Sequence, residues 1–380
     1  MKSFKKLVIL DKIILSESQW TALRLMANEV VEYSGLTPKQ IMEKLAIEQG
    51  TDPGAVCFTA LALEQITERE LNARLAGADA IVSCWTNIPD SVLLNNPQIK
   101  YVGFWTNLVQ HRINLKLAKE MGIHVTYIPD YGTIAVAEYT FALLLELMRS
   151  VARQASDTAS GKWPYELLKT SLYVPSIDAI PYHTLCGKSL GIIGFGRIGQ
   201  QVAQIALGFG MKVSYYSKSC KTDWKNRGVE FKNLDEVLKT SDIVSIHLSP
   251  YANVDPLGRV SIDDHAPDCP EQGPKIEDIP IISKKKLALL KDGALLINTS
   301  AGRLLEEDAL FEEVLSGRIR VAIDVYRNNP NKKHIQAVIS RHGKDRNIFT
   351  YRGGWLTYES VLKKGDSLIE QAGKFLHEIQ

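Results

Sequence analysis

The sequence predicts an α/β fold with two mostly parallel sheets. Short apolar runs rich in β-branched residues alternate with stretches of helical periodicity through most of the 380 residues. The alternation falls into two regions that meet near residue 130. Because single cores stop growing beyond roughly 250–300 residues, a chain of this length is expected to form two domains or so.

The first region contains four runs that we expect to be strands. Each is short, apolar and bounded by polar or turn residues, which favours a strand over a helix. The expected strands are Leu7–Leu10, Ala80–Ser83, Ile99–Gly103 and Ile123–Tyr127, with helices between them that include Ser18–Val31 and Glu68–Leu75.

The second region opens near Ile134 with a long apolar helix and continues with the same alternation. Three of its expected strands each follow a helical stretch, as in repeated strand–helix–strand units. These strands are Ile243–His247, Ala294–Asn298 and Arg320–Asp324, and the preceding helices are Leu234–Leu238, Lys284–Leu290 and Glu306–Leu315.

A glycine-rich turn lies near the start of this second region. Gly194, Gly196 and Gly199 have Gly-x-Gly-x-x-Gly spacing, follow the run Leu190–Ile193 and open a helix that extends to Gly208. Such glycines permit a tight turn, close approach of backbone N–H groups to a pyrophosphate, and packing of the helix on the strand. The motif alone also joins strands to helices without any ligand. Here the next strand, Met211–Tyr216, completes a unit of about 30 residues, as a dinucleotide site requires.

The end of that next strand indicates which dinucleotide binds. Sites for NAD place an acidic residue there to accept from the ribose 2′-hydroxyl, and its charge repels a 2′-phosphate. This chain instead has Ser217 and Lys218, with Lys221 just beyond. The sequence therefore favours NADP(H), with NAD as the alternative if the lysines are only solvated surface residues.

Composition excludes several other classes of function. The formal net charge is only +2 and no basic cluster alternates with aromatic residues, so we expect no nucleic-acid partner. The five cysteines lack metal-binding or disulfide spacing, so we expect no metal and a cytoplasmic location. The apolar run near the N-terminus is interrupted by Asp11 and Lys12, which favours a first strand over a signal peptide, and no segment is long enough to span a bilayer.

One segment interrupts the alternation. From Tyr251 to Ile282 the chain carries five prolines and seven acidic residues and has no regular period. Long irregular segments inside a domain are usually functional or disordered. Since it follows the carboxyl end of an expected strand, we expect it to close over the substrate, with a mobile surface insertion as the alternative.

Taken in order, these motifs resemble the D-2-hydroxyacid dehydrogenase family. The resemblance covers roughly residues 95–355 and rests on the glycine turn with its flanks and on six further runs: Gly122–Ile123, Ile134–Glu138, Leu234–Leu238, Ser241–His247, Ile297–Gly302 and Ala322–Tyr326. It implies two Rossmann-like domains. A flavodoxin-like substrate domain would comprise residues 1–129 and 352–380, and the dinucleotide-binding domain residues 130–351. It also implies a small-molecule substrate and a homodimer.

The three catalytic side chains of the family are replaced in this chain. Its Asn-x-x-Arg-Gly turn corresponds to Asn298–Gly302, which places Ala301 at the position of the arginine that binds the substrate carboxylate. Its Glu corresponds to Asn329, and its His to Tyr351. Neither Asn nor an ordinary Tyr can replace directly a His–Glu pair that titrates near neutral pH. Reduction of simple 2-keto acids by the usual mechanism is therefore not expected.

The cofactor half of the resemblance is retained. Asp324 stands where the family binds the nicotinamide carboxamide, and Thr299 lies in the corresponding turn. Together the motif and the resemblance imply a cofactor site of nine residues: Gly194, Gly196, Arg197, Ile198, Gly199, Ser217, Lys218, Thr299 and Asp324.

Three functions remain open from the sequence. We favour an NADP(H)-dependent oxidoreductase with altered acid/base residues and a substrate larger than a simple 2-keto acid. In it Tyr351 donates a proton, and Arg303, Arg327 and Arg352 are the candidates for a nearby cation, with Arg303 two residues past the replaced arginine. Asn329 occupies the site, and His265 is a further acid/base candidate. Surface arginines usually only solvate, and a tyrosine beside a glycine pair usually packs. The alternatives are a non-catalytic NADP(H)-binding regulatory protein and a lyase or dehydratase with a bound nicotinamide cofactor.

Overall fold

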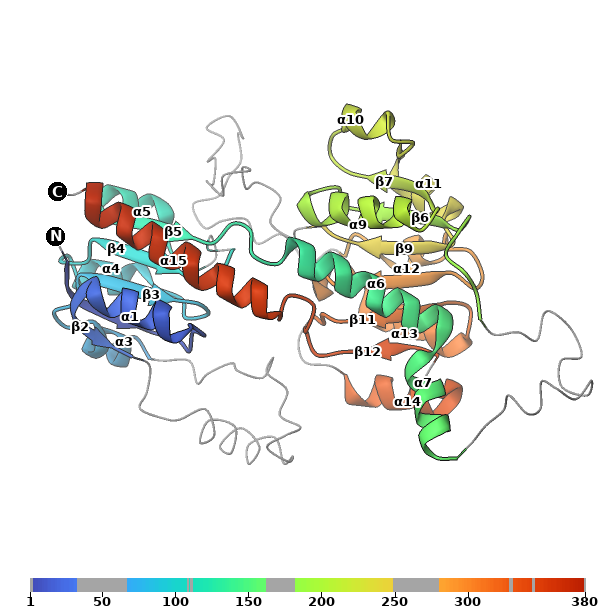
Figure 1. Cartoon of the computed structure of the whole chain (residues 1–380), viewed down its shortest axis with the longest axis horizontal. Helices are drawn as coiled ribbons and strands as arrows, with labels where there is room; N and C mark the ends of the chain where they lie inside the picture. The colour runs from blue at the N-terminus through green and yellow to red at the C-terminus, as the bar shows by residue number, and fades with distance from the viewer. Residues whose placement is uncertain are drawn as a thin grey trace, which may run out of the picture. The chain divides into compact units, whose positions relative to one another are not determined.

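The computed structural model describes residues 3–32, 67–107, 109, 112–161, 182–248, 280–327, 331–343 and 346–378 (Figure 1). These residues form two compact units. Unit 1 contains the described residues up to Tyr131 and from Leu356 onward, and unit 2 those from Gly132 to Trp355. Each unit is built on its own parallel sheet.

Unit 1 has a five-stranded sheet in the order β2-β1-β3-β4-β5, which is the flavodoxin-like arrangement predicted from the resemblance. Every neighbouring pair is parallel. The strands are β1 (Phe4–Ile9), β2 (Ala27–Val31), β3 (Ala80–Ser83), β4 (Tyr101–Phe104) and β5 (His124–Tyr127). The helices are α1 (Glu17–Leu25), α3 (Glu68–Leu75), α4 (Asp90–Asn95), α5 (Leu115–Glu120) and α15 (Tyr358–Glu378).

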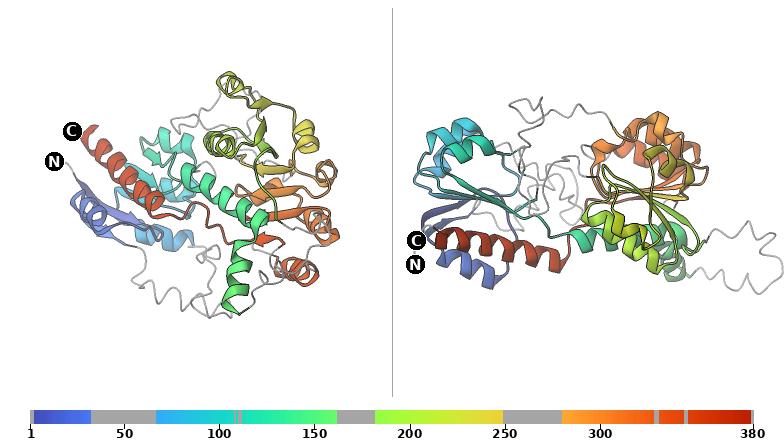
Figure 2. Two further views of the ribbon diagram at one scale, coloured as in Figure 1. Left: turned by 45° about the vertical axis from the view of Figure 1, so that its right-hand side comes forward. Right: turned by 90° about the horizontal axis from the view of Figure 1, so that it is seen from above.

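Helices cover both faces of this sheet (Figure 2). On one face, apolar residues of α3, α4 and α5 pack on Val8, Ile81 and Val102. On the other, the long helix α15 brings Phe375 against the rings of Phe4 and Tyr101. Burial on both faces explains why the central strands β3 and β4 are buried along their whole length and almost wholly apolar.

The helix predicted over Ser18–Val31 is wrong in its second half. Helix α1 ends at Leu25, and Ala27–Val31 is the edge strand β2, paired in parallel with β1. Asn28, Val30 and Val31 are poor helix formers, whereas β-branched residues suit a strand. Parallel pairing with β1 favours a strand over a helix for this segment. Such pairing between distant segments cannot be inferred from a local sequence pattern.

Unit 2 has a seven-stranded parallel sheet in the order β12-β11-β10-β9-β6-β7-β8. This is the doubly wound order of dinucleotide-binding domains, in which the strand order reverses beside the first strand, here β6. The strands are β6 (Ser189–Ile193), β7 (Lys212–Tyr216), β8 (Glu230–Phe231), β9 (Ile243–Ile246), β10 (Leu295–Asn298), β11 (Arg320–Ile323) and β12 (Ile348–Phe349).

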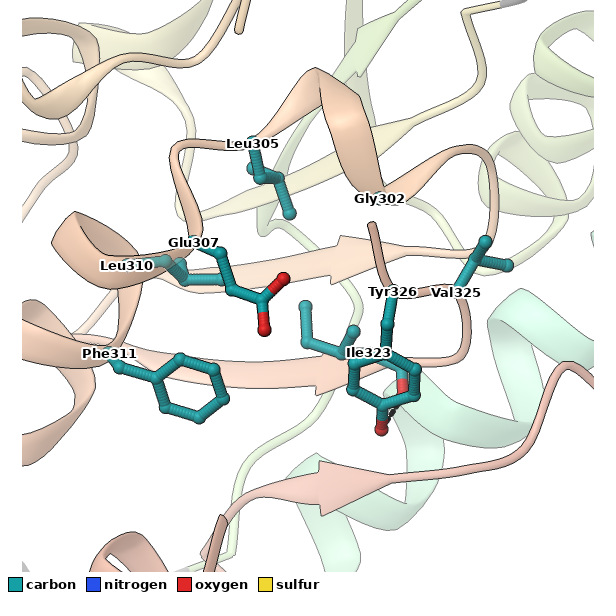
Figure 3. Close-up of a pocket in the computed structure, with 8 residues that line it drawn as sticks. All are labelled: Gly302, Leu305, Glu307, Leu310, Phe311, Ile323, Val325 and Tyr326. Atoms are coloured by element: carbon teal, nitrogen blue, oxygen red, sulfur yellow. Dashed lines mark hydrogen bonds between the residues drawn. The ribbon is translucent and has the colours of Figure 1, made fainter. Parts of the chain in front are cut away.

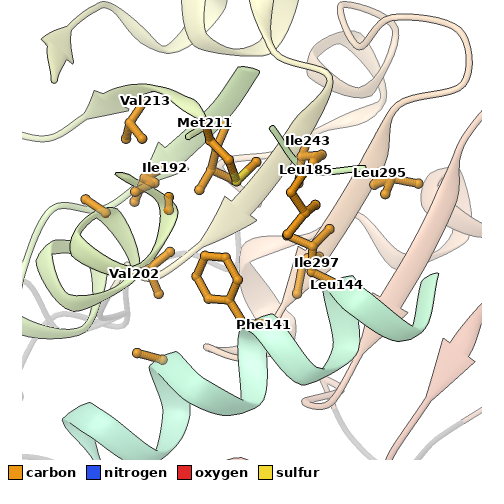
Figure 4. Close-up of a cluster of buried hydrophobic side chains, with 14 of the residues drawn as sticks. Phe141, Leu144, Leu185, Ile192, Val202, Met211, Val213, Ile243, Leu295 and Ile297 are labelled. Atoms are coloured by element: carbon orange, nitrogen blue, oxygen red, sulfur yellow. The ribbon is translucent and has the colours of Figure 1, made fainter. Parts of the chain in front are cut away.

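Two apolar clusters hold the helices of unit 2 against its sheet. The first packs α6 (Thr133–Arg149) and α9 (Arg197–Gly208) on one face, with Phe141 and Val202 among the residues between them (Figure 4). The second packs α11 (Leu234–Thr240), α12 (Lys284–Leu287), α13 (Glu307–Ser316) and α14 (Lys332–His342) on the other face. Short helices α7 (Val151–Ala159), α10 (Thr222–Lys225) and η4 (Gly302–Leu304) complete the unit. The predicted strands and helices of this region are confirmed to within a few residues.

No helix in the described part of the chain is both long enough and apolar enough to cross a membrane.

Candidate cofactor and active site

The glycine turn follows β6 at the carboxyl edge of the unit 2 sheet. Gly194 has a φ of +99°, a backbone conformation that residues with a Cβ rarely adopt. Its N–H donates to the carbonyl of Tyr216 at 2.9 Å. A Cβ on Gly194 would lie 2.6 Å from the backbone of His247 at the end of β9. Only glycine therefore fits between these two strand ends.

The other two glycines of the turn differ in their surroundings. A Cβ on Gly199 would overlap the carbonyl oxygen of Gly194, so helix α9 can pack this closely on the turn only with glycine there. A Cβ on Gly196, the N-cap of α9, would meet no described atom within 4 Å. Gly196 therefore faces open space at the start of a 12-residue helix, which is where a pyrophosphate fits. Arg197 and Ile198 form the first turn of the same helix, with Arg197 exposed.

Ser217 and Lys218 follow β7 directly beside the glycine turn, because Gly194 is hydrogen-bonded to Tyr216. Ser217 is half-buried and Lys218 is exposed. The next residues are held by Tyr215, whose hydroxyl accepts from the N–H of Lys221 at 2.7 Å and whose ring stacks on Phe195. The chain therefore presents a hydroxyl and a cation where an acidic residue would exclude a 2′-phosphate.

His247 lies beneath the glycine turn and was not singled out as a site residue by the sequence. Its N–H donates to the carbonyl of Ile193 at 2.7 Å, and its Nε2 is 2.8 Å from the hydroxyl of Ser245. Its Nδ1 has no hydrogen-bond partner among the described residues. Burial lowers the pKa of His247 to about 3, so the imidazole is neutral at physiological pH.

The turn after β10 is built around Asn298. The Asn298 side chain donates to the carbonyls of Ala301 and Val325 and accepts from the N–H of Ser300 at 3.1 Å. Thr299 is buried, with its hydroxyl 3.2 Å from that of Thr140 on α6. These hydrogen bonds join the turn to the end of β11 and to α6.

Ala301 and Arg303 lie at the end of this turn. Ala301 is half-buried in extended conformation just before η4, and Arg303 is half-buried within η4. A Cβ on Gly302, between them, would overlap the backbone of Tyr326 and Arg327, so this glycine seats the turn against the end of β11. The Ala301 side chain at this turn is a single methyl group, which can neither donate nor accept a hydrogen bond.

Asp324 follows β11 and organises the turn that carries Tyr351. Its buried carboxylate accepts from the Thr350 hydroxyl at 2.7 Å and from the N–H groups of Gly353 and Gly354 at 3.0 and 3.2 Å. The same turn contains Arg352 in the left-handed region, with φ +62°. Tyr351 itself is 59% exposed. The sequence predicted that Asp324 binds the cofactor, but it did not reveal that the same carboxylate holds the turn that carries Tyr351.

Tyr139 of α6 borders the same turn and was also missed by sequence reasoning. Its hydroxyl would lie 3.5 Å from a Cβ on Gly353, and its ring 3.1 Å from one on Gly354. Burial raises the pKa of Tyr139, and the nearby Asp324 and Tyr351 add to the rise, whereas a hydrogen bond with Thr350 opposes it. The neighbouring run Ile134–Glu138 belongs to the resemblance, but nothing in the sequence indicated which side chain of the helix meets the turn.

A small pocket adjoins these turns between β11 and α13 (Figure 3). Its volume is about 260 Å³, part of which is open to solvent. The lining is mainly apolar and includes Leu310, Phe311 and Ile323. Glu307 points into it, and burial raises the pKa of that carboxyl group. No sequence-predicted site residue lines this pocket.

The structure thus brings most of the predicted cofactor residues to one edge of unit 2. The ends of β6, β7, β10 and β11 carry the glycine turn, Ser217 with Lys218, Thr299 and Asp324. Tyr351 and Arg303 lie on turns fixed to that edge. Asn329 lies outside the described residues, as do His265 and nearly all of the Tyr251–Ile282 segment.

This strand order and glycine turn define a dinucleotide-binding protein, and sequence comparison specifies the family. The profile for "D-isomer specific 2-hydroxyacid dehydrogenase, NAD binding domain" matches residues 141–254 and 275–342. A hydroxypyruvate reductase from Blautia hydrogenotrophica is 30% identical over 308 residues, which cover 81% of this chain and 85% of the relative. The chain belongs to the D-isomer specific 2-hydroxyacid dehydrogenase family, whose members are NAD(P)-dependent oxidoreductases.

Solved structures share the fold over almost the whole chain. A D-lactate dehydrogenase from Aquifex aeolicus complexed with NAD and lactic acid has a TM-score of 0.66 at 22% identity, covering 98% of this chain and 96% of that one. An acyclic imino acid reductase in complex with NADPH and D-Arg has a TM-score of 0.67 at 22% identity, covering 98% and 97%. The fold is therefore found with either nicotinamide cofactor.

Proposed function

We propose that this protein is an NADP(H)-dependent reductase whose acid/base residues differ from those of its family, acting on a substrate larger than a simple 2-keto acid. The proposal rests on a contrast between two sets of turns at the carboxyl edge of the unit 2 sheet. The turns of the cofactor side have their glycines and Asp324, whereas the turn after β10 has Ala301 at the position that we assign to the family's arginine. The replaced contacts are those made to the substrate.

The residues at the carboxyl edge of unit 2 fit a nicotinamide dinucleotide. Gly196 leaves room for a pyrophosphate at the start of α9, and Ser217 with Lys218 suits a 2′-phosphate. Arg197, Ile198, Thr299 and Asp324 would complete the contacts. When bound, the cofactor supplies or accepts a hydride. The role of the chain is to orient that group and the substrate beside it.

Tyr351 is the proposed proton donor. It occupies the family's histidine position on a turn that Asp324 and two glycine N–H groups hold in place, and its exposed phenol can reach a ligand. Arg303 is the proposed cation that stabilises negative charge developing on the substrate. Asn329 is assigned to the site by sequence position alone, as a hydrogen-bonding group where the family has its Glu.

The test is a pre-steady-state measurement of NADPH oxidation with a panel of carbonyl and imine substrates that extends beyond three-carbon acids. Tyr351→Phe removes only the phenolic hydroxyl group, and we expect it to reduce the rate of hydride transfer with NADPH affinity retained. Tyr358→Phe is a matched control, because Tyr358 is an exposed tyrosine of α15. Tight NADPH binding without oxidation by any substrate would favour the regulatory function, and equal rates for Tyr351→Phe and the wild type would remove Tyr351 from the mechanism.

The roles of the two units and the assembly are part of the proposal. We assign residues 1–129 and 352–380 to substrate binding and residues 130–351 to cofactor binding, in a cytoplasmic homodimer. A fragment comprising residues 130–351 should bind NADPH if this division is correct, and analytical ultracentrifugation of the full chain measures the assembly.

A further inference from the structure

Helix α6 places two consecutive polar side chains against two different turns of unit 2. The Thr140 hydroxyl donates to the carbonyl of Val136 at 2.8 Å, so Thr299 is the donor in the 3.2 Å contact between the two threonine hydroxyls. Tyr139 instead borders the turn after β12, where its hydroxyl is hydrogen-bonded to Thr350. The other side chains that α6 buries are apolar. The helix therefore binds both turns through the two residues that can form hydrogen bonds there.

The hydrogen bonds around Thr350 have a defined direction. Thr350 donates its proton to the Asp324 carboxylate at 2.7 Å, so its oxygen is left to accept from the Tyr139 hydroxyl. Burial raises the pKa of Tyr139, and the charges of Asp324 and Tyr351 add to the rise, so the phenol is a neutral donor at physiological pH. The three groups form one chain that ends on a negative charge, and neighbouring bonds in such a chain polarise one another.

The ring of Tyr139 limits the space around the glycine pair of the same turn. A Cβ on Gly354 would lie 3.1 Å from Cδ1 of Tyr139 and 3.3 Å from the Asp324 carboxylate, so this glycine is held between the ring and the carboxylate. A Cβ on Gly353 would lie 3.5 Å from the Tyr139 hydroxyl. Tyr139 therefore contacts the turn through its ring as well as through its hydroxyl.

The backbone of this turn depends on such contacts. Arg352, which directly follows Tyr351, has a φ of +62°, a conformation that costs free energy for a residue with a Cβ. Strained residues of this kind persist only where the surrounding structure fixes them. The Arg352 N–H donates to the carbonyl of Asp324 at 2.8 Å, which ties this side of Tyr351 to the end of β11. Tyr139 holds the other side from α6, through Thr350.

We propose that Tyr139 is a positioning residue for the proposed proton donor, and that it acts through Thr350 on the turn that carries Tyr351. The inference rests on the proposed function in taking Tyr351 as the proton donor. All of these residues belong to unit 2, and the role requires no contact between Tyr139 and the substrate. Loss of the Tyr139 hydroxyl should therefore loosen this turn and leave the rest of unit 2 unchanged.

Amide hydrogen exchange, followed by NMR in the full-length protein, tests the positioning without a substrate. Tyr139→Phe keeps the ring and removes the hydrogen bond to Thr350. We expect the N–H groups of Gly353 and Gly354 to exchange about tenfold faster, the effect of losing roughly one hydrogen bond. The N–H of Leu295 in β10 should exchange at the wild-type rate, because its strand is not part of the turn.

Tyr101→Phe is the matched control for this experiment. Tyr101 of unit 1 also pairs its hydroxyl with that of a threonine, Thr126, at 2.7 Å, so the substitution removes the same kind of bond from the other unit. It should leave exchange at Gly353 and Gly354 unchanged. Wild-type exchange of these two glycines in Tyr139→Phe, or equal acceleration of every amide in unit 2, would overturn the proposal.

A kinetic measurement separates positioning from a purely structural role. With the panel substrate that the wild type reduces fastest, Tyr139→Phe should lower the rate of hydride transfer by about tenfold, while KM and NADPH affinity change by less than about twofold. In a Tyr351→Phe background the same substitution should have no further effect, because the residue that it positions has lost its proton. Thr350→Ser, which keeps the hydroxyl, should retain the wild-type rate.

The outcomes distinguish this inference from the proposed function. A further loss of rate when Tyr139→Phe is added to Tyr351→Phe would overturn the positioning role and leave the cofactor assignment intact. Absence of turnover with every substrate of the panel would contradict the proposed function, and the exchange of Gly353 and Gly354 would still decide whether Tyr139 holds the turn.

Discussion

The Thr350 hydroxyl donates a 2.7 Å hydrogen bond to the Asp324 carboxylate, which joins the end of β11 to the turn that carries Tyr351. Two glycine N–H groups complete the set around that carboxylate. The acidic residue expected to bind the nicotinamide therefore also positions the proposed proton donor. In the proposed function, cofactor binding and proton donation are therefore coupled through one side chain.

Asp324→Ala should destabilise unit 2 and disorder this turn. It leaves one hydroxyl and two N–H groups unpaired in a buried site, so we expect a loss of about 2–4 kcal/mol in the free energy of unfolding. Thr350→Val, which removes one partner, should cost about 1 kcal/mol. Urea denaturation measures both. Equal effects of the two substitutions would show that the carboxylate does not organise the turn.

Gly194→Ala and Gly196→Ala should separate folding from cofactor binding. At Gly194 both the positive φ and the 2.6 Å approach to His247 oppose a Cβ, so we expect a loss of at least about 2 kcal/mol in stability. At Gly196 the methyl group enters open space, so the fold should be retained while NADPH binds more weakly. Thermal unfolding and fluorescence titration give the two readouts. Unchanged NADPH affinity in Gly196→Ala would place the pyrophosphate elsewhere.

The protein should bind NADPH more tightly than NADH, because Ser217 and Lys218 stand where an acidic residue would repel the 2′-phosphate. Ser217→Asp should reverse this preference. Fluorescence titration with both cofactors measures it, and Ser219→Asp, on the neighbouring exposed position, controls for a general effect of added charge. A wild type that prefers NADH would contradict the NADP(H) assignment.

Glyoxylate, pyruvate and hydroxypyruvate should be poor substrates, because Ala301 cannot make the bidentate carboxylate contact of an arginine. Ala301→Arg should improve kcat/KM for glyoxylate by about tenfold or more through that contact. Steady-state assays of NADPH oxidation decide the matter. Wild-type turnover near the typical enzymatic value of about 10 per second would mean that another residue performs the arginine's role.

Buried His247 should make stability fall in mild acid. Its folded pKa of about 3 lies below the ordinary value of 6.5, so the unfolded chain binds more protons between these limits. Stability is therefore highest above about pH 6.5 and declines as the pH falls toward 3, by about 2 kcal/mol between pH 6.5 and 5. Denaturation curves of the wild type and His247→Gln at both pH values measure this contribution. The same pH dependence in the variant would assign it to other groups.

The sequence by itself determined the two parallel sheets, the glycine turn and the family. These features are local, because a strand ending in Gly-x-Gly-x-x-Gly can be interpreted from consecutive residues. Gly194 illustrates this, since its spacing predicted a tight turn and its φ of +99° confirms one. The assignment of Ala301 was possible for the same reason, since the turn retains Asn298 and Gly302 on either side.

Contacts between distant segments were decided only by the tertiary structure. Strand β2 was predicted as a helix because its pairing with β1 spans more than 20 residues of sequence. Tyr139 contacts Gly353 and Gly354, and Lys364 lies over the Trp105 ring. These residues are far apart in the sequence, so the periodicity of hydrophobic residues cannot predict their contacts. Burial and pKa follow from such contacts, because they depend on which side chains exclude water from a group. The sequence therefore predicted the glycine turn of the proposed cofactor site, whereas the contacts of Tyr139 and Lys364 became visible only in the fold.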